Sequence, residues 1–389
     1  MRRNRVIGCS VLAILLTSLG AIALGAFGTP AVRALDLFPV RTLWTLRLGR
    51  QLGLPPAYSG RHAYFALDGN QLVAYDLASG MREWQVAGAP ETALAAGGGL
   101  VFLVERAGLS ALHAADGRAA WRFALGARLT TPPTWDNGWL VLTAEDGDII
   151  ALRGLDGQPI WRRAAKARAR VAPSLAADRL YVALEDGRIL ALRIDTGDII
   201  WESRVGGSPT SLLALDDRLF VGSTDNFFYC LLAKSGTWDW RWRTGGDIVG
   251  APVVDDRRVY FVSFDNVLRA LSRKTGGQQW VRLLPLRPAG GAIRAGSALI
   301  VAAVAPALRA YRMSDGGPAG DLATDGELAA PVYPVPDTTL PTLLVVTRDL
   351  ATGATAKLVA RQLEPSPTTL APLANPVKLP ALPDAAPSK

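Results

Sequence analysis

The sequence has very few of the side chains that build metal centres and disulfide frameworks, with two cysteines and two histidines among 389 residues. Cys9 lies in an apolar N-terminal run and Cys230 far downstream, so no disulfide can form within the part of the chain after that run. His62 and His113 are too few and too scattered for a zinc site of the usual histidine kind. We therefore expect no metal site, and both histidines at the surface.

Motifs for nucleophilic catalysis, phosphate binding and structural zinc are also absent from the sequence. The net charge is +8, but four arginines and no acidic residue precede residue 35, which leaves +4 on residues 35–389. So small a surplus on so long a chain does not favour a nucleic-acid partner. The missing motifs do not exclude catalysis at a site that only the fold assembles.

The N-terminus has the features of a membrane anchor. Arg2, Arg3 and Arg5 precede an uncharged run from Val6 to Gly28, which is long enough to cross a bilayer and longer than the roughly 7–15 apolar residues of a signal peptide. We expect a single-pass signal anchor within residues 1–34, with the rest on the periplasmic or extracellular side. A signal peptide cleaved after Ala34 is the alternative. Most of the apolar run follows Cys9, whereas a lipid-attachment cysteine comes after its apolar run, so we interpret Cys9 as a membrane residue.

Seven copies of one pattern, about forty residues apart, fill most of the remaining chain. They read AYDLASGMREW (74–84), ALHAADGRAAW (111–121), ALRGLDGQPIW (151–161), ALRIDTGDIIW (191–201), CLLAKSGTWDW (230–240), ALSRKTGGQQW (270–280) and a decayed AYRMSDGGPAG (310–320). Such a period indicates a propeller or a solenoid, whose units cannot bury their apolar faces alone.

Within one repeat, the pattern predicts short strands joined by tight turns. Residues 180–187, 188–195 and 198–204 alternate between apolar and polar side chains and break at turn residues. A fourth, more apolar strand precedes each trio, as at residues 173–176. Four strands in about forty residues is the composition of a propeller blade.

Six of the copies place a tryptophan four residues after a turn glycine, and these are Trp84, Trp121, Trp161, Trp201, Trp240 and Trp280. A large flat side chain at a fixed place on the outermost strand can lie across the gap to the next blade and bury a large apolar area. We therefore expect these residues to be structural. The pattern resembles the tryptophan-docking motif of pyrroloquinoline quinone (PQQ) repeat propellers, over about residues 41–363.

The number of blades depends on the chain ends. Residues 331–363 supply three strands without a tryptophan strand, whereas residues 42–49, with Trp44, look like an isolated closing strand. Joining them would remove the open edge of the last sheet. We predict an all-β, eight-bladed propeller of four-stranded antiparallel blades over residues 35–363, with seven blades as the alternative if residues 285–324 form no full blade. The proline-rich residues 364–389 are predicted to be a disordered tail.

Quinoprotein dehydrogenases share this fold, and the resemblance implies what such an activity would need. Their cofactor lies centrally, beside a calcium ion held by acidic and amide side chains, with a catalytic aspartate and a ring formed by two adjacent cysteines. This chain has no adjacent cysteines, and Cys230 takes the place of an alanine in sister repeats, which favours a small buried residue. We identify no catalytic or cofactor-binding residue and expect no cofactor; PQQ and calcium are expected only if the dehydrogenase alternative holds.

Two groups of side chains are candidate partner-binding sites. A basic cluster with no acidic residue inside it suits an acidic protein or anionic lipid head groups, with a solvated loop as the alternative. Trp238 and Trp242 flank Trp240 in an alternating run, which predicts all three on one side of a strand, as a sugar-stacking or protein-binding patch or as extra packing. The basic cluster comprises Arg162, Arg163, Lys166, Arg168 and Arg170.

A set of aspartates recurs in register at the turns between the second and third strands of each repeat. A ring of carboxylates on one face could bind a cation or a basic partner, but aspartate before glycine or asparagine is also ordinary turn chemistry. We interpret them as turn residues. They are Asp68, Asp146, Asp186, Asp225 and Asp265.

These observations favour a membrane-tethered, extracytoplasmic propeller that binds or assembles envelope proteins without catalysis. The resemblance is to BamB-like propellers, which are non-enzymatic subunits of the outer-membrane β-barrel assembly machinery. Those proteins are lipoproteins, and this chain lacks a correctly placed lipid cysteine. A PQQ-dependent oxidoreductase and a carbohydrate or cell-wall binder are the alternatives. A carboxylate and amide pair around central calcium would indicate the former, and exposure of both Trp238 and Trp242 the latter.

Overall fold

The structure is a computed structural model that describes residues 36–349 and 351–363. The expected anchor or signal peptide in residues 1–34 and the expected tail at 364–389 lie outside these residues. In the described part every regular element is a strand. No helix within it is long and apolar enough to span a membrane.

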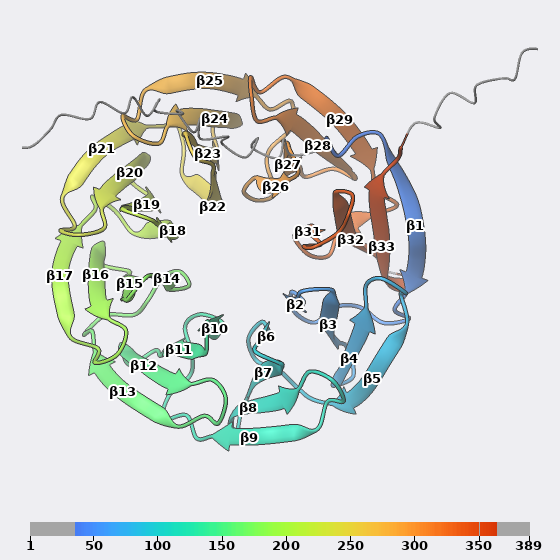
Figure 1. The fold of residues 1–389 in the computed structure, drawn as a ribbon, viewed down its shortest axis with the longest axis horizontal. Helices are drawn as coiled ribbons and strands as arrows, with labels where there is room; N and C mark the ends of the chain where they lie inside the picture. Colours follow the sequence, from blue (N-terminus) through green and yellow to red (C-terminus); the bar gives the residue numbers. More distant parts are fainter. Residues whose placement is uncertain (1–35, 350, 364–389) are drawn as a thin grey trace, which may run out of the picture. The chain divides into compact units, whose positions relative to one another are not determined.

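The strands form eight antiparallel sheets arranged as the blades of a ring, which confirms the predicted fold class (Figure 1). In each blade the first strand lies near the ring axis and the last strand at the circumference. Blades one to four are β2 (Ala57–Ser59), β3 (His62–Leu67), β4 (Gln71–Asp76), β5 (Arg82–Ala87); β6 (Ala95–Gly97), β7 (Leu100–Glu105), β8 (Gly108–His113), β9 (Ala119–Phe123); β10 (Thr134–Asp136), β11 (Trp139–Thr143), β12 (Asp148–Arg153), β13 (Pro159–Ala164); and β14 (Ser174–Ala176), β15 (Arg179–Ala183), β16 (Arg188–Arg193), β17 (Ile199–Arg204).

Blade seven forms a complete four-stranded sheet, so the alternative of seven blades is wrong. Blades five to eight are β18 (Pro209–Leu215), β19 (Arg218–Ser223), β20 (Phe227–Leu232), β21 (Trp238–Arg243); β22 (Ile248–Val254), β23 (Arg258–Ser263), β24 (Val267–Ser272), β25 (Gln278–Leu283); β26 (Ile293–Ala295), β27 (Ala298–Ala302), β28 (Ala307–Arg312), β29 (Pro318–Ala323); and β30 (Glu327–Leu328), β31 (Tyr333–Pro334), β32 (Thr342–Asp349), β33 (Gly353–Arg361), β1 (Val40–Arg47).

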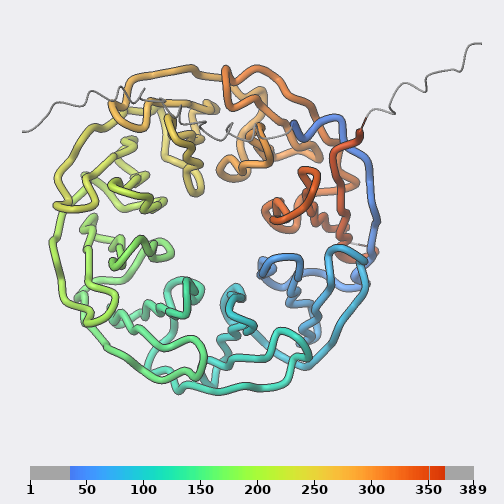
Figure 2. Tube along the Cα trace, in the orientation of Figure 1, coloured from blue at the N-terminus to red at the C-terminus, as the bar shows by residue number. Residues whose placement is uncertain are grey.

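The last blade joins the two ends of the described chain. Strand β1 pairs antiparallel with β33, from Val40 opposite Arg361 to Arg47 opposite Thr355. Figure 2 shows this first strand lying beside the last segment of the ring. The predicted closing strand with Trp44 is therefore confirmed, and the pairing leaves no open edge at the end of the repeat array.

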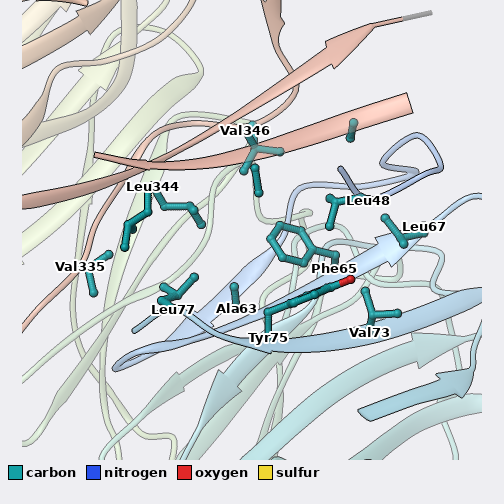
Figure 3. Packing of buried hydrophobic residues seen from close by; sticks show 14 residues of the cluster. Leu48, Ala63, Phe65, Leu67, Val73, Tyr75, Leu77, Val335, Leu344 and Val346 are labelled. Carbon is teal, nitrogen blue, oxygen red and sulfur yellow. The ribbon is translucent and has the colours of Figure 1, made fainter. Parts of the chain in front are cut away.

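The apolar core lies between neighbouring blades. At the junction of blades eight and one, Leu344 and Val346 of β32 pack towards Phe65 and Tyr75 of blade one (Figure 3). The middle strands of each blade are apolar on both faces because each face meets another blade. Sequence alternation is therefore weakest in these strands and clearest in the outer ones, whose second face meets solvent.

Candidate functional site

The repeated tryptophans hold neighbouring blades together. Each indole ring lies against the turn glycine of the next blade, and its Nε1 donates a hydrogen bond of 2.6–3.2 Å to a backbone carbonyl there. The stacked pairs are Trp44 on Gly80, Trp84 on Gly117, Trp121 on Gly157, Trp161 on Gly197, Trp201 on Gly236, Trp240 on Gly276 and Trp280 on Gly316. These side chains are engaged in packing and are not available to a ligand.

Glycine is required in each pair for two reasons, its backbone conformation and its contact with the indole ring. Gly197 has φ of +71°, which a side chain disfavours, and an added Cβ would lie 2.6 Å from the Trp161 ring. One residue before each docking tryptophan, the outer strand contains a β-bulge, as between Ala191 and Leu192 in the register of β16 and β17. The bulge lets the tryptophan point across to the next blade.

The decayed seventh copy is completed by a residue from elsewhere in the chain. Strand β29 has Gly320 where the sister strands have tryptophan, and a Cβ there would lie 2.4 Å from the Phe38 ring. Phe38 precedes β1 and packs with the cluster that includes Val332 and Leu343. An aromatic ring thus spans the junction of blades seven and eight as well. No repeat comparison could have assigned this role to Phe38, because it lies outside the repeats.

Four of the five turn aspartates make local side-chain contacts. Asp146 and Asp186 each accept a hydrogen bond from the backbone two residues later. Asp225 accepts from the Tyr229 hydroxyl, and Asp265 accepts from Gly245 N at 2.9 Å and from Arg269. Asp265 thus holds the connection between blades five and six directly. Asp225 reaches the connection between blades four and five only through the Tyr229 hydroxyl, which accepts from Gly206 N at 3.2 Å.

Most of the basic cluster is neutralised by carboxylates of blades three and four. Arg162 pairs with Asp148 and Asp146, Arg163 with Asp198 at 2.8 Å, and Arg168 with Glu185 at 3.4 Å. Arg163 also donates from Nε to Gly197 O at 2.8 Å and so braces the next blade. Lys166 and Arg170 are exposed and, within the described residues, have no ion-pair partner.

The structure separates Trp238 from Trp242, so the expectation that three tryptophans share one side is wrong for Trp238. The bulge between Cys230 and Leu231 in the register of β20 and β21 reverses the side on which Trp238 projects. Trp242 is partly buried against the cluster between blades five and six. Trp238 is exposed and packs on Tyr229, with ring centroids 5.1 Å apart.

Trp238 belongs to a small aromatic surface on the outer flank of blade five, which we call the flank patch (Phe227, Trp238 and Arg241) and which lies over the buried Tyr229. The Arg241 guanidinium lies 4.7 Å from the Phe227 ring centroid and 5.2 Å from that of Trp238. Trp238 Nε1 donates to Arg204 O at 3.2 Å. The patch is therefore a fixed aromatic surface with one cation over it.

A second exposed surface, not found from the sequence, lies on the side of the ring that contains the turns between second and third strands. We call it the turn patch (Phe264, Leu286, Arg287 and Val304). Phe264, Leu286 and Val304 are 42%, 41% and 71% exposed. The Arg287 guanidinium lies 4.6 Å from the Phe264 centroid, and Val304 N donates to Arg287 O at 3.0 Å. These residues come from different loops, so no sequence motif contains them.

Cys230 is a buried core residue, in agreement with its place in the repeat. It lies in the cluster that contains Phe220 and Phe228. Burial raises the pKa of its thiol to about 12 although Arg218 lies near. The thiol therefore stays protonated, which does not suit a nucleophile.

A cleft of about 420 Å³ lies on the inner side of blades six to eight. We asked whether its lining residues could bind PQQ and calcium. Its lining residues, Gly250, Gly291, Ile293 and Val332 among them, are all glycine or apolar. None of these described residues offers the carboxylate, amide or cation that calcium and PQQ require. The residues of this cleft do not fit that cofactor.

Comparison with solved structures shows the fold. BamB from Moraxella catarrhalis is 20% identical, with a TM-score of 0.65 over 82% of this chain and 99% of that chain. A computationally designed protein is 14% identical, with a TM-score of 0.66 over 80% of this chain and 96% of that chain. Quinohemoprotein alcohol dehydrogenase from Comamonas testosteroni is 13% identical, with a TM-score of 0.65 over 84% of this chain and 77% of that chain.

Comparison with protein families adds a sequence relationship to this likeness of fold. No curated protein matches the sequence. The family model described as outer membrane protein assembly factor BamB matches residues 28–108, 88–212 and 210–328. Because these matches cover most of the chain, the protein belongs to this family of PQQ-like β-propellers.

Proposed function

We propose that the protein is a non-enzymatic scaffold of the cell envelope, and that it binds a protein of outer-membrane assembly through the turn patch. The family description supports the class of partner. The observation on which the proposal rests is the turn patch itself, where Phe264, Leu286 and Val304 expose apolar surface beside Arg287. Exposed apolar side chains gathered around one arginine are typical of protein interaction sites.

The chemistry of the turn patch suits a protein partner. Aromatic and arginine side chains give most of the binding energy in protein interfaces when they become fully desolvated. Arg287 lies over the Phe264 ring, so the two side chains together present an aromatic and a cationic contact to a partner. The flank patch has similar residue types, but its exposed apolar surface is mostly Trp238 alone.

The N-terminal sequence supports a tethered location. The uncharged run from Val6 to Gly28 behind three arginines would anchor the chain and send the propeller to the extracytoplasmic side. A single-pass anchor takes the place that a lipid has in BamB-like lipoproteins. We propose this arrangement with the propeller facing the periplasm, where an outer-membrane assembly protein is accessible.

The test is cross-linking of the tagged full-length protein in its own membranes, followed by quantitative mass spectrometry of co-purified outer-membrane assembly proteins. The double variant Phe264→Ala/Val304→Ser should lower their recovery about tenfold or more, as expected for loss of a hot spot. Leu155→Ala, which changes an equally exposed leucine on blade three, is the matched control. Unchanged recovery with the double variant would refute the turn patch as the binding surface.

A second experiment separates the scaffold proposal from the quinoprotein alternative. If the protein is a scaffold, titration with PQQ and calcium, followed by tryptophan fluorescence, should show no saturable binding. Reduction of an artificial electron acceptor with alcohols or sugars should not exceed the rate without protein. Calcium-dependent PQQ binding with turnover would refute the scaffold proposal and make the chain a dehydrogenase.

A further inference from the structure

Three side chains with metal-binding chemistry meet on blade one, although the sequence predicted no metal site. His62 begins β3, Asp76 ends β4, and Glu83 is the bulge residue of β5. One ligand atom from each lies within 4.8 Å of the other two, and His62 Nε2 is 3.4 Å from Glu83 Oε1. His62 and Asp76 are opposite each other in the β3–β4 register, so both side chains leave the sheet on one face.

Asp76 is held by hydrogen bonds to only one of its two carboxylate oxygens. The residue is 8% exposed, and its Oδ1 accepts hydrogen bonds of 2.8 Å from Ser79 N and Ser79 Oγ. Oδ2 is buried and makes no hydrogen bond. Arg61 Nε lies 2.9 Å from Oδ2 as an ion pair, but the Arg61 side chain is 65% exposed and can turn to solvent.

Asp76 is held in place as a carboxylate by its neighbours, through the two Ser79 hydrogen bonds and the Arg61 ion pair. A buried carboxylate oxygen without a donor is costly unless a cation or donor satisfies it. Arg61 supplies that positive charge from the solvent side, and a cation held between the three side chains would supply it from within the cluster.

The same three strand positions in blade five form an ion pair instead of a set of metal ligands. There the equivalents are Arg218, Leu232 and Asp239, and Arg218 Nη2 lies 3.0 Å from Asp239 Oδ2. The arginine also pairs with Asp217 at 2.7 Å, so it is the only cation among these three positions and both its partners are carboxylates. Blade one has histidine in place of the arginine and a carboxylate in place of the leucine, so its three positions are all potential metal ligands.

We propose that His62, Asp76 and Glu83 bind one divalent transition-metal ion, with zinc as the best match. One imidazole nitrogen and two carboxylate oxygens are common zinc ligands, and a water would take the fourth position. Two carboxylates balance the charge of the ion while the imidazole is neutral. The ion would link three adjacent strands of blade one beside the seam at which the ring closes, and would stabilise the folded state by mass action.

The test uses the full-length protein, freed of metal with a chelator and titrated with Zn²⁺ by calorimetry, with Co²⁺ absorption as a measure of coordination geometry. One zinc should bind per chain, and the thermal unfolding midpoint should rise. His62→Ala and Glu83→Gln should each weaken the affinity at least about tenfold. His113→Ala, which removes the other histidine on an exposed position, is the matched control and should bind as the parent does.

Two results would overturn the proposal. Absence of saturable zinc binding to the parent protein, or parent-like affinity in folded His62→Ala, would identify the cluster as an ion pair of His62 with its neighbours. Folding of each variant is checked by its tryptophan fluorescence spectrum. The readouts do not involve a protein partner, so failure here leaves the proposed scaffold function intact.

Discussion

At the scale of single residues, the docking glycines permit the sharpest prediction because one glycine offers a matched control. Gly197 and Gly49 both have φ of +71°, but an added Cβ meets Trp161 at Gly197 and nothing within 4 Å at Gly49. Gly197→Ala should lower the free energy of unfolding by about 3 kcal/mol, from backbone strain plus displacement of the indole. Gly49→Ala should cost about 1 kcal/mol, from strain alone. Denaturant unfolding measures both, and equal losses would contradict the packing role.

Cys230 gives a second prediction at this scale. Burial raises the pKa of its thiol to about 12, so the thiol stays neutral and shielded in the folded protein. In a Cys9→Ser background, a disulfide reagent at mildly alkaline pH should not label the native protein and should label it fully in denaturant. Rapid labelling of the native form would show that the blade five core opens.

The sequence predicted the residues whose roles repeat and missed those whose roles do not. Trp161 and Gly197 could be found because every blade repeats their spacing. Trp238 was misplaced because a bulge of one residue reverses the side of a strand, and alternation alone does not reveal a bulge. Phe38 was missed because it lies far from blade seven in the sequence, although it takes the place of that blade's docking tryptophan.

At the scale of elements, the connections between blades depend on turn aspartates. Burial would raise the pKa of Asp265, but Arg269, Ser263 and Gly245 N stabilise the carboxylate and hold its pKa below 3.8. A depressed pKa in the folded state gives stability that is present above about pH 3.8 and is lost as the pH falls through the folded value.

Asp265→Asn should therefore lower the free energy of unfolding by about 2 kcal/mol at neutral pH, through loss of charge-assisted hydrogen bonds. The difference from the parent should shrink as the pH falls below 3.8. Asp146→Asn is the control. Asp146 is half-exposed, accepts one hydrogen bond from Asp148 N within its own turn and pairs with Arg162 at 3.4 Å, so the variant should lose less than about 1 kcal/mol. Denaturant titrations across pH measure this, and a pH-independent loss at Asp265 would contradict the argument.

Candidate sites at this scale could be predicted only in part. The basic cluster was found from its composition, but its carboxylate partners come from other strands, such as Asp148 and Asp198. The sequence predicted no metal site because it has only two histidines. Nothing in it shows that Asp76 and Glu83 lie beside His62. Loops also assemble the turn patch, and the repeat does not determine their side chains.

At the scale of the whole molecule, the ring is closed by non-covalent contacts at a single blade. Blade eight contains β1 and β33 from opposite ends of the described chain, and Trp44 docks it on blade one through a 3.0 Å hydrogen bond to Leu77 O. Closure of the two ends could be predicted because the sequence leaves one blade without a tryptophan strand and one tryptophan strand without a blade.

Trp44→Ala should therefore loosen the seam before the rest of the ring. Amide hydrogen exchange should accelerate in β1 and β33 while the middle blades remain protected, because a locally weakened unit opens below the global unfolding free energy. Trp201→Ala, inside the covalently continuous part of the ring, is the comparison and should leave exchange in β1 and β33 unchanged. Uniform acceleration in Trp44→Ala would mean that the ring unfolds only as one unit.

The central claim is that this propeller holds an outer-membrane assembly protein on the turn patch, and site-specific photo-cross-linking in the envelope tests it most directly. A photoreactive residue at position 304 should give a discrete cross-link to an outer-membrane assembly protein. The same residue at position 155, on an equally exposed turn of blade three, should give none. Cross-links of equal yield at both positions, or none at 304, would contradict the account.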